Sequence, residues 1–192
     1  MEENKIILLA GPTSSGKSKL AILLAKKLDG EIINADSMQV YKELSILTSR
    51  PSKSDLKKIN HHLYGFKSAK NNFSVGEWLK QTTKIIKKLI KSNKTPIIVG
   101  GTGLYFKSLT DGLVNLPNIP ISLRTRVRKM HKLIGQKEFY YKLIKLDPLA
   151  KNFVLPMDAQ RSMRAYEVKK KTNISLSIWF KKTKSNYDEK KF

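Results

Sequence analysis

The residues with the plainest chemical signature lie close to the N-terminus and match the phosphate-binding pattern G-x-x-x-x-G-K-[ST]. They are Gly11, Pro12, Thr13, Ser14, Ser15, Gly16, Lys17 and Ser18. An apolar run at residues 5–10 precedes them and helix-forming residues follow at 19–28, so the order is strand, loop, helix. Such a loop aims backbone N–H groups and the positive end of a helix at a phosphate. We therefore expect Lys17 to add charge at the outer phosphate and the Ser18 hydroxyl to bind Mg²⁺. The alternative is a chance match at a helix N-terminus.

Two further apolar runs end in residues that could do chemistry. Asp36 and Ser37 follow the run at 31–35, and a Gly-Gly-Thr-Gly turn containing Thr102 follows the run at 95–99. In open α/β sheets, ligands bind at the carboxyl ends of the strands. Asp36 is therefore a candidate for catalysis, with a helix cap or a ligand of magnesium-bound water as alternatives. Thr102 could offer its hydroxyl and its N–H to a ligand, or the glycines could serve only a tight turn.

The elements that must position these residues alternate between strands and helices. We expect strands at 5–10, 31–35 and 95–100 and helices at 19–28, 52–59, 75–92 and from 104. Ser74 and Glu77 form a capping box before the third of these helices, whose apolar face predicts core packing. The alternation predicts a P-loop α/β fold with three layers and a parallel sheet. His61 and His62 point to opposite sides of any regular element, so we interpret them as structural or surface residues and not as a metal site.

A break containing proline and asparagine at 112–120 separates this pattern from a helical one. Helices are expected at 122–134, 137–146, 158–171, where Asp158 is the N-cap, and 175–182. We therefore predict a core at 1–114, a small basic helical insert domain at 115–185, and a segment at 186–192 where the core would resume.

The charge of the chain is strongly positive and favours a polyanionic partner. There are 38 basic and 15 acidic residues, which gives a net charge of +23. Only six basic residues are arginines, and five of them, Arg124, Arg126, Arg128, Arg161 and Arg164, fall in the helical part. Arginine binds phosphate with two parallel hydrogen bonds, which suggests nucleic acid. The alternative is a surface of solvated lysines.

The chain has no cysteine, which excludes a disulfide framework or a thiolate metal site and suits the cytoplasm. The first residues are acidic, unlike a signal peptide, and no apolar run approaches the roughly 20 residues of a membrane helix. We expect a cytoplasmic monomer without a membrane partner.

Four runs taken together resemble the tRNA dimethylallyltransferase (tRNA isopentenyltransferase) family. They are residues 11–18 (GPTSSGKS), 34–41 (NADSMQVY), 99–105 (VGGTGLY) and 158–167 (DAQRSMRAYE). The resemblance extends to about residue 175, and four motifs in the same order make it specific.

The resemblance implies transfer of a dimethylallyl group from dimethylallyl diphosphate to N6 of the adenosine beside the anticodon of tRNA, at position 37, with release of diphosphate. The loop at 11–18 would then bind a prenyl diphosphate, with Mg²⁺, and no Walker B aspartate is needed after strand 95–99. The resemblance gives Asp36 the role of general base and makes Thr102 and Arg124 catalytic. The tRNA-binding residues that it implies are Asp36, Ser37, Met38, Gln39, Gln160, Arg161, Ser162, Met163 and Arg164.

Two other functions remain open at this point. A P-loop kinase for a nucleotide or small molecule would bind ATP in the same loop. Members of the family are also longer than this chain, so an inactive, truncated RNA-binding remnant is the second alternative.

Overall fold

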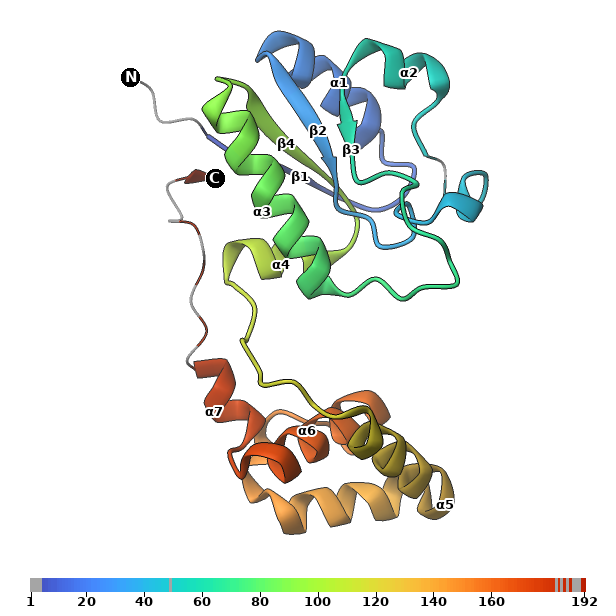
Figure 1. Cartoon of the computed structure of the whole chain (residues 1–192), viewed down its shortest axis with the longest axis vertical. Helices are drawn as coiled ribbons and strands as arrows, with labels where there is room; N and C mark the ends of the chain where they lie inside the picture. Colours follow the sequence, from blue (N-terminus) through green and yellow to red (C-terminus); the bar gives the residue numbers. More distant parts are fainter. Residues whose placement is uncertain (1–4, 49, 182, 184, 186, 188–190) are drawn as a thin grey trace. The chain divides into compact units, whose positions relative to one another are not determined.

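The computed structural model describes residues 5–48, 50–181, 183, 185, 187, 191 and 192. The chain divides into two compact units (Figure 1). The first consists of Met1–Leu113 with Ser185–Phe192, and the second of Val114–Lys184. Each unit has its own cluster of buried apolar side chains and is described separately.

A parallel sheet of four strands in the order β1-β4-β2-β3 forms the centre of the first unit. Its strands are β1 (Ile7–Ala10), β2 (Gly30–Asn34), β3 (His61–His62) and β4 (Thr95–Gly100). The central pair is in register with Ile32 opposite Ile97, and Ile97 is opposite Ile7 on its other side. The parallel arrangement confirms the predicted α/β fold, because all the strand ends that carry candidate residues meet at one edge of the sheet.

Helices cover both faces of this sheet and complete the three layers. They are α1 (Lys17–Lys27), α2 (Lys53–Lys58), α3 (Val75–Lys91) and α4 (Gly103–Thr110), with a short 3₁₀ helix, η1 (Lys42–Leu44). Ile32 and Ile97 pack with Ala21 and Ala25 of α1 on one face. Alternate strand residues such as Ile33 pack on the other face against α3 and α4, as the two-residue period of strands requires.

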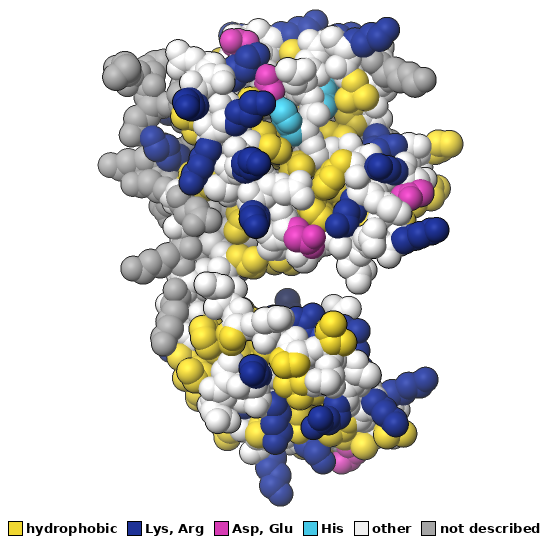
Figure 2. All heavy atoms as spheres, in the orientation of Figure 1, with side chains coloured by type: hydrophobic (Ala, Val, Ile, Leu, Met, Phe, Trp, Pro, Cys, Tyr) yellow, Lys and Arg dark blue, Asp and Glu magenta, His cyan; other side chains and the backbone are white. Residues whose placement is uncertain are grey.

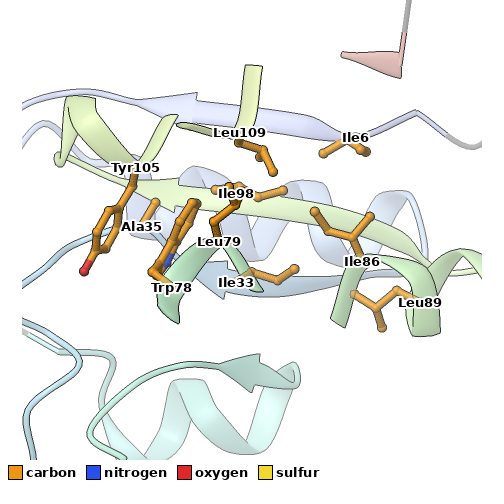
Figure 3. Close-up of a cluster of buried hydrophobic side chains, with 10 residues drawn as sticks. All are labelled: Ile6, Ile33, Ala35, Trp78, Leu79, Ile86, Leu89, Ile98, Tyr105 and Leu109. Carbon is orange, nitrogen blue, oxygen red and sulfur yellow. The ribbon is translucent and has the colours of Figure 1, made fainter. Parts of the chain in front are cut away.

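The cluster beneath α3 and α4 contains an aromatic pair that reaches the end of β2 (Figure 3). The rings of Trp78 and Tyr105 stack with centroids 4.4 Å apart and planes 11° apart. Trp78 Nε1 also donates a hydrogen bond of 2.7 Å to the carbonyl oxygen of Asn34. The capping box predicted at Ser74 and Glu77 is present and begins α3. The helix is thereby fixed against the edge of the sheet that carries Asp36.

The described residues near the end of the chain belong to the first unit. The Ile6 N–H donates to the carbonyl oxygen of Lys191 at 2.6 Å, beside β1. Tyr187 and Phe192 pack against the same apolar cluster as α3. Ser185 Oγ donates a hydrogen bond of 3.4 Å to the carbonyl oxygen of Leu109 in α4.

The second unit is helical. It contains α5 (Ile121–Leu146), a 3₁₀ helix η2 (Pro148–Asn152), α6 (Ala159–Thr172) and α7 (Leu176–Lys181). Gly135 interrupts α5 with a left-handed φ of 75°, so the segment consists of the two helices that the sequence predicts. Asp158 caps α6 by accepting a hydrogen bond from the Arg161 N–H at 2.9 Å. The core of the unit is built on Phe139 and Leu143.

The start of β2 carries a polar network at the edge of the sheet opposite the phosphate loop. Glu31 is largely buried. Its carboxylate accepts a hydrogen bond of 3.0 Å from Asn60 and lies 2.7 Å from His62 Nε2. Lys94 lies 3.3 Å from the same carboxylate. Burial raises the pKa of Glu31, but the bonds from Asn60, His62 and Lys94 outweigh burial and hold it below its ordinary value of 4.5. The histidines thus have the structural role predicted for them. An open cavity of about 360 Å³ adjoins this network and contains no residue of the phosphate loop.

Candidate functional site

The phosphate loop connects β1 to α1 and adopts a conformation that its two glycines permit. Gly16, at the start of α1, has a φ of 81°, which a residue with a side chain rarely adopts. Ser14 also lies in the left-handed region, with a φ of 64°. The Gly11 N–H donates a 3.2 Å hydrogen bond to the carbonyl oxygen of Gly100, so the loop is held against β4. Lys17 Nζ donates to the carbonyl oxygen of Pro12, across the loop.

Asp36 lies just after β2 and is positioned by the side chain of Asn34. Asn34 is fully buried. Its Oδ1 accepts from the Asp36 N–H at 2.9 Å, and its Nδ2 donates to the Asp36 carbonyl oxygen at 2.9 Å. The same Nδ2 donates to the carbonyl oxygen of Leu63 at 3.0 Å. Asn34 therefore fixes the backbone of Asp36 and ties it to the chain that follows β3.

The carboxylate of Asp36 uses one oxygen for the local turn. Oδ1 accepts from the N–H groups of Met38 at 2.9 Å and Gln39 at 3.4 Å. Among the described residues, Oδ2 accepts no hydrogen bond. Asp36 thus caps a turn and not a helix, unlike the helix-cap alternative of the sequence analysis, and keeps a second oxygen for a ligand or a proton.

Thr102 joins the ends of β2 and β4. Its Oγ1 accepts a hydrogen bond of 2.9 Å from the Ser37 N–H, and its own N–H donates to the carbonyl oxygen of Ala35 at 3.1 Å. The expectation that Thr102 offers its N–H to a ligand is therefore wrong, because Ala35 already accepts that proton. The hydroxyl proton remains as a donor. Gly100 permits this contact, since a Cβ there would lie 2.1 Å from the Ala35 carbonyl group.

A cavity of about 60 Å³ is lined both by part of the phosphate loop and by Asp36, whereas Thr102 and Ser37 are not in its lining. Its lining consists of Thr13, Ser14, Lys17, Ser18, Asp36, Gln39, Thr48, Tyr64, Val99 and Gly100. The phosphate loop and Asp36 therefore line one cavity. Sequence reasoning did not single out Thr48 or Tyr64 for this site, because neither lies in a motif or at the end of a predicted strand.

Two tyrosines near Asp36 are held in their neutral form. Burial raises the pKa of Tyr105 to about 12, and the nearby charges of Tyr41, Asp36 and Glu77 add to the effect. Burial also raises the pKa of Tyr64, again with a contribution from Asp36. A phenol that stays neutral can donate a hydrogen bond beside a carboxylate without repelling it.

The predicted tRNA-binding run on α6 divides between the surface and the interior of its unit. Gln160 and Arg161 are exposed, and Arg161 forms a 3.1 Å ion pair with Asp158. Ser162 is fully buried and accepts a hydrogen bond from Gln136 at 3.1 Å.

The remaining two residues of this run, Met163 and Arg164, differ in their contacts. Met163 packs against the core of the second unit. Arg164 lies 3.4 Å from Glu167 and is partly exposed. Gln160, Arg161 and Arg164 are thus accessible to a ligand, whereas Ser162 and Met163 support the helix.

Arg124 lies in the first part of α5, in the second unit. Its Nε is buried without a hydrogen-bond partner among the described residues. Its backbone N–H donates to the carbonyl oxygen of Pro120 at 3.1 Å. The residue therefore retains a donor that the fold of its own unit does not use.

The residues of the site suit a magnesium ion that arrives with a phosphate ligand. Among the described residues, no three His, Asp or Glu side chains gather into a metal-binding group. A magnesium ion bound to substrate phosphates needs few protein oxygens. The Ser18 hydroxyl and the Asp36 carboxylate line the same cavity and are oxygen donors of the required kind.

Basic side chains are spread over the visible face of both units, with few acidic ones between them (Figure 2). This distribution follows from the net charge of +23 and produces a positive potential toward polyanions. Within the described part of the chain, no helix combines the length and apolar character needed to cross a membrane.

Residues 39–192, more than half of the chain, match the family model described as IPP transferase. A tRNA dimethylallyltransferase of Pelagibacter ubique is 56% identical over 191 residues, covering 100% of this chain and 61% of the relative. One of Rhizobium rhizogenes is 45% identical over 183 residues, covering 95% of this chain and 61% of the relative. The chain thus spans about three-fifths of the length of these curated relatives.

Solved structures give the same result. A eukaryotic dimethylallyltransferase acting on tRNA superposes with a TM-score of 0.81 and 30% identity, covering 94% of this chain and 45% of the other. A tRNA isopentenylpyrophosphate transferase of Bacillus halodurans superposes with a TM-score of 0.58 and 33% identity, covering 88% of this chain and 56% of the other. The sequence motifs, the parallel sheet and these similarities agree, and the chain belongs to the IPP transferase family of tRNA-modifying prenyltransferases.

Proposed function

We propose that this chain transfers a dimethylallyl group from dimethylallyl diphosphate to N6 of the adenosine at position 37 of tRNA, beside the anticodon. The observation that carries the proposal is the cavity shared by the phosphate loop and Asp36. A diphosphate on one side and a carboxylate on the other are what this substitution requires. The names of the similar proteins supply the substrates.

The reaction balances with the groups at this site. The bond between C1 of the donor and the diphosphate oxygen breaks, and diphosphate leaves with the electron pair. A bond forms between C1 and N6 of the adenosine, and N6 releases one proton. Because the amine lone pair is delocalised into the ring, a base that accepts this proton is worth about 10²–10⁴ in rate. Asp36 Oδ2, which accepts no hydrogen bond among the described residues, takes that role.

The phosphate loop stabilises the leaving diphosphate. Residues 11–18 present backbone N–H groups and the N-terminus of α1, and Lys17 changes its partner from the Pro12 carbonyl oxygen to a phosphate oxygen. The Ser18 hydroxyl would hold Mg²⁺ together with the diphosphate, and the ion would neutralise further negative charge on the leaving group. Thr102 donates its hydroxyl proton. Arg124 takes the catalytic role that the family resemblance implies, and its Nε has no hydrogen-bond partner among the described residues.

The second unit supplies tRNA contacts through the exposed residues of α6. Arg161, Arg164 and Gln160 reach phosphates or base edges, while Ser162 and Met163 hold the helix. Ser37, Met38 and Gln39 contact the target nucleotide beside Asp36. The adenosine must leave its stack to reach the cavity, so we expect base flipping. We propose that the chain acts as a monomer in the cytoplasm.

The test is a transfer assay with the full chain, Mg²⁺, dimethylallyl diphosphate and unmodified tRNA. We expect a mass gain of one dimethylallyl group on adenosine 37, and none on a tRNA with guanosine at that position. A folded chain that produces no modified tRNA contradicts the proposal. Tight binding of ATP in preference to dimethylallyl diphosphate would favour a kinase instead. Salt-sensitive tRNA binding without transfer would favour an RNA-binding remnant.

A further inference from the structure

A second, smaller cavity lies beside the site, and Tyr64 belongs to the walls of both. The smaller cavity measures about 20 Å³. The two cavities share Ser18, Tyr64 and Val99 in their linings. Of these three side chains, only that of Tyr64 is large enough to form a partition.

The backbone on each side of Tyr64 is fixed to the turn that carries Asp36. The Leu63 carbonyl oxygen accepts a hydrogen bond of 3.0 Å from Asn34 Nδ2. The Gly65 N–H donates to the carbonyl oxygen of Gln39 at 2.9 Å. The ring itself meets His61 edge-on, with centroids 5.6 Å apart and planes at 71°. The hydrogen bonds of Leu63 and Gly65 therefore fix the backbone of Tyr64, whose ring lies between the two cavities.

The smaller cavity beyond this wall is mainly apolar. Ala21, Ile22, Ile32 and Pro51 contribute apolar surface to its lining, and Asp55 and His61 contribute polar groups. At about 20 Å³ it has room for about one water molecule, which is far less than a five-carbon unit needs. Removal of the Tyr64 ring would join this space to the larger cavity and lengthen the site toward Ile22 and Ile32.

The position of an allylic diphosphate follows from the proposed function, on which this inference rests. Its phosphates lie on the loop at 11–18 and its C1 atom faces Asp36. The hydrocarbon tail must then contact the apolar part of the larger cavity, where Tyr64 and Val99 lie. Because burial raises the pKa of Tyr64, no charge develops on this wall at neutral pH.

We infer that Tyr64 sets the length of the prenyl chain that the site accepts. The ring contacts the end of a five-carbon tail and blocks the second isoprene unit of a ten-carbon donor. This makes Tyr64 a specificity-determining residue for the allylic diphosphate. The chemistry of transfer is unchanged, because the group does not exchange a proton with the reacting atoms.

The experiment compares binding of dimethylallyl diphosphate and geranyl diphosphate to the full chain by calorimetry, with Mg²⁺ and without tRNA. We expect the wild type and Tyr64→Phe, which keeps the ring, to prefer dimethylallyl diphosphate by at least about tenfold. Tyr64→Ala should shift this preference toward geranyl diphosphate by about 10- to 100-fold. The same ratio is then measured for transfer to tRNA as kcat/KM.

A second variant separates a specific cavity from general loosening. Adding Ile22→Phe to Tyr64→Ala refills the smaller cavity and should restore the preference for the shorter donor. If Tyr64→Ala does not fold, Tyr64→Leu replaces it with the same expected direction. Equal binding of both donors by the wild type, or an unchanged ratio in a folded Tyr64→Ala chain, overturns the role of Tyr64 alone. No binding of dimethylallyl diphosphate by the folded wild type overturns the proposed function as well.

Discussion

Asn34 holds Asp36 from two sides, accepting a hydrogen bond from its backbone N–H and donating one to its carbonyl oxygen, each at 2.9 Å. Both atoms of the Asn34 amide are therefore committed to the residue that we propose as the base. The backbone carbonyl oxygen of Asn34 is bound in turn by Trp78. Hydrogen bonds therefore connect the proposed base through Asn34 to Trp78 in the packed core beneath α3.

Replacement of Asn34 should reduce turnover without removing any atom from the cavity. Asn34→Ala leaves the Asp36 backbone groups and the Leu63 carbonyl oxygen without this partner, at a cost of about 1–3 kcal/mol in unfolding free energy. We expect kcat to fall while Kd for dimethylallyl diphosphate changes little, because the phosphate loop is untouched. Asn34→Ser, which retains one hydrogen-bonding group, should recover part of kcat. A fall in donor affinity equal to the fall in kcat would contradict a positioning role.

Asp36→Asn should abolish most turnover and preserve the local fold. An asparagine Oδ1 still accepts from the Met38 N–H, so the turn keeps its cap. The amide cannot accept the N6 proton, and single-turnover transfer should slow by about 10²–10⁴-fold. Melting temperature serves as the control and should remain close to the wild type. Normal transfer by a folded Asp36→Asn chain would exclude Asp36 as the base.

Loss of the Arg161 side chain should weaken tRNA binding in a salt-dependent way. The side chain is exposed beside Asp158 and provides one positive charge at the N-terminus of α6. Arg161→Ala should lower the slope of log K against log salt by about one, as expected for one lost phosphate contact. Lys80→Ala, which removes an exposed charge from α3 in the first unit, is the matched control. If both variants weaken tRNA binding equally, affinity depends on the total positive charge of the chain and not on a phosphate contact at Arg161.

Glu31 should make the stability of the first unit depend on pH in the acid range. Its folded pKa lies below the ordinary value of 4.5 because hydrogen bonds from Asn60, His62 and Lys94 outweigh its burial. A depressed pKa stabilises the fold above the unfolded pKa, and that contribution disappears as pH falls through the lower, folded pKa. Thermal melts of Glu31→Gln should therefore show a smaller loss of stability between about pH 5 and pH 3 than the wild type.

The control for this comparison is Asp111→Asn, which removes an exposed carboxylate from the same unit. Asp111→Asn should lose as much stability as the wild type when the pH is lowered through the same acid range. If melting temperature depends on pH equally in Glu31→Gln and in the wild type, the network at the start of β2 contributes nothing to the pH dependence of stability.

The sequence predicts the fold well because its signals are local. The capping box at Ser74 and Glu77, the Asp158 cap and the glycines of the phosphate loop each determine a nearby conformation. Strand ends that carry Asp36 and Thr102 could be expected to meet, since parallel strands place their carboxyl ends together.

The parts that sequence reasoning missed depend on contacts between distant residues. Tyr64 enters the site because Asn34 and Gln39 fix the chain on either side of it, and no spacing rule indicates that pairing. The N–H of Thr102 is committed to Ala35, which depends on the close approach of Gly100 to β2. One signal was present: Asn34 is an amide that follows the apolar pair Ile32 and Ile33 at the end of a buried strand, and a buried amide there requires partners.

The hydrogen bond between Ser185 and Leu109 joins the returning chain to the helix that precedes the helical unit. The chain leaves the first unit after Leu113 and returns at Ser185, close to a residue of the helix that it left. The helical unit is thus an interruption with neighbouring ends, and a short linker could replace residues 114–184. Selection can then vary or exchange the helical unit while residues 11–18 and Asp36 keep their arrangement in the first unit.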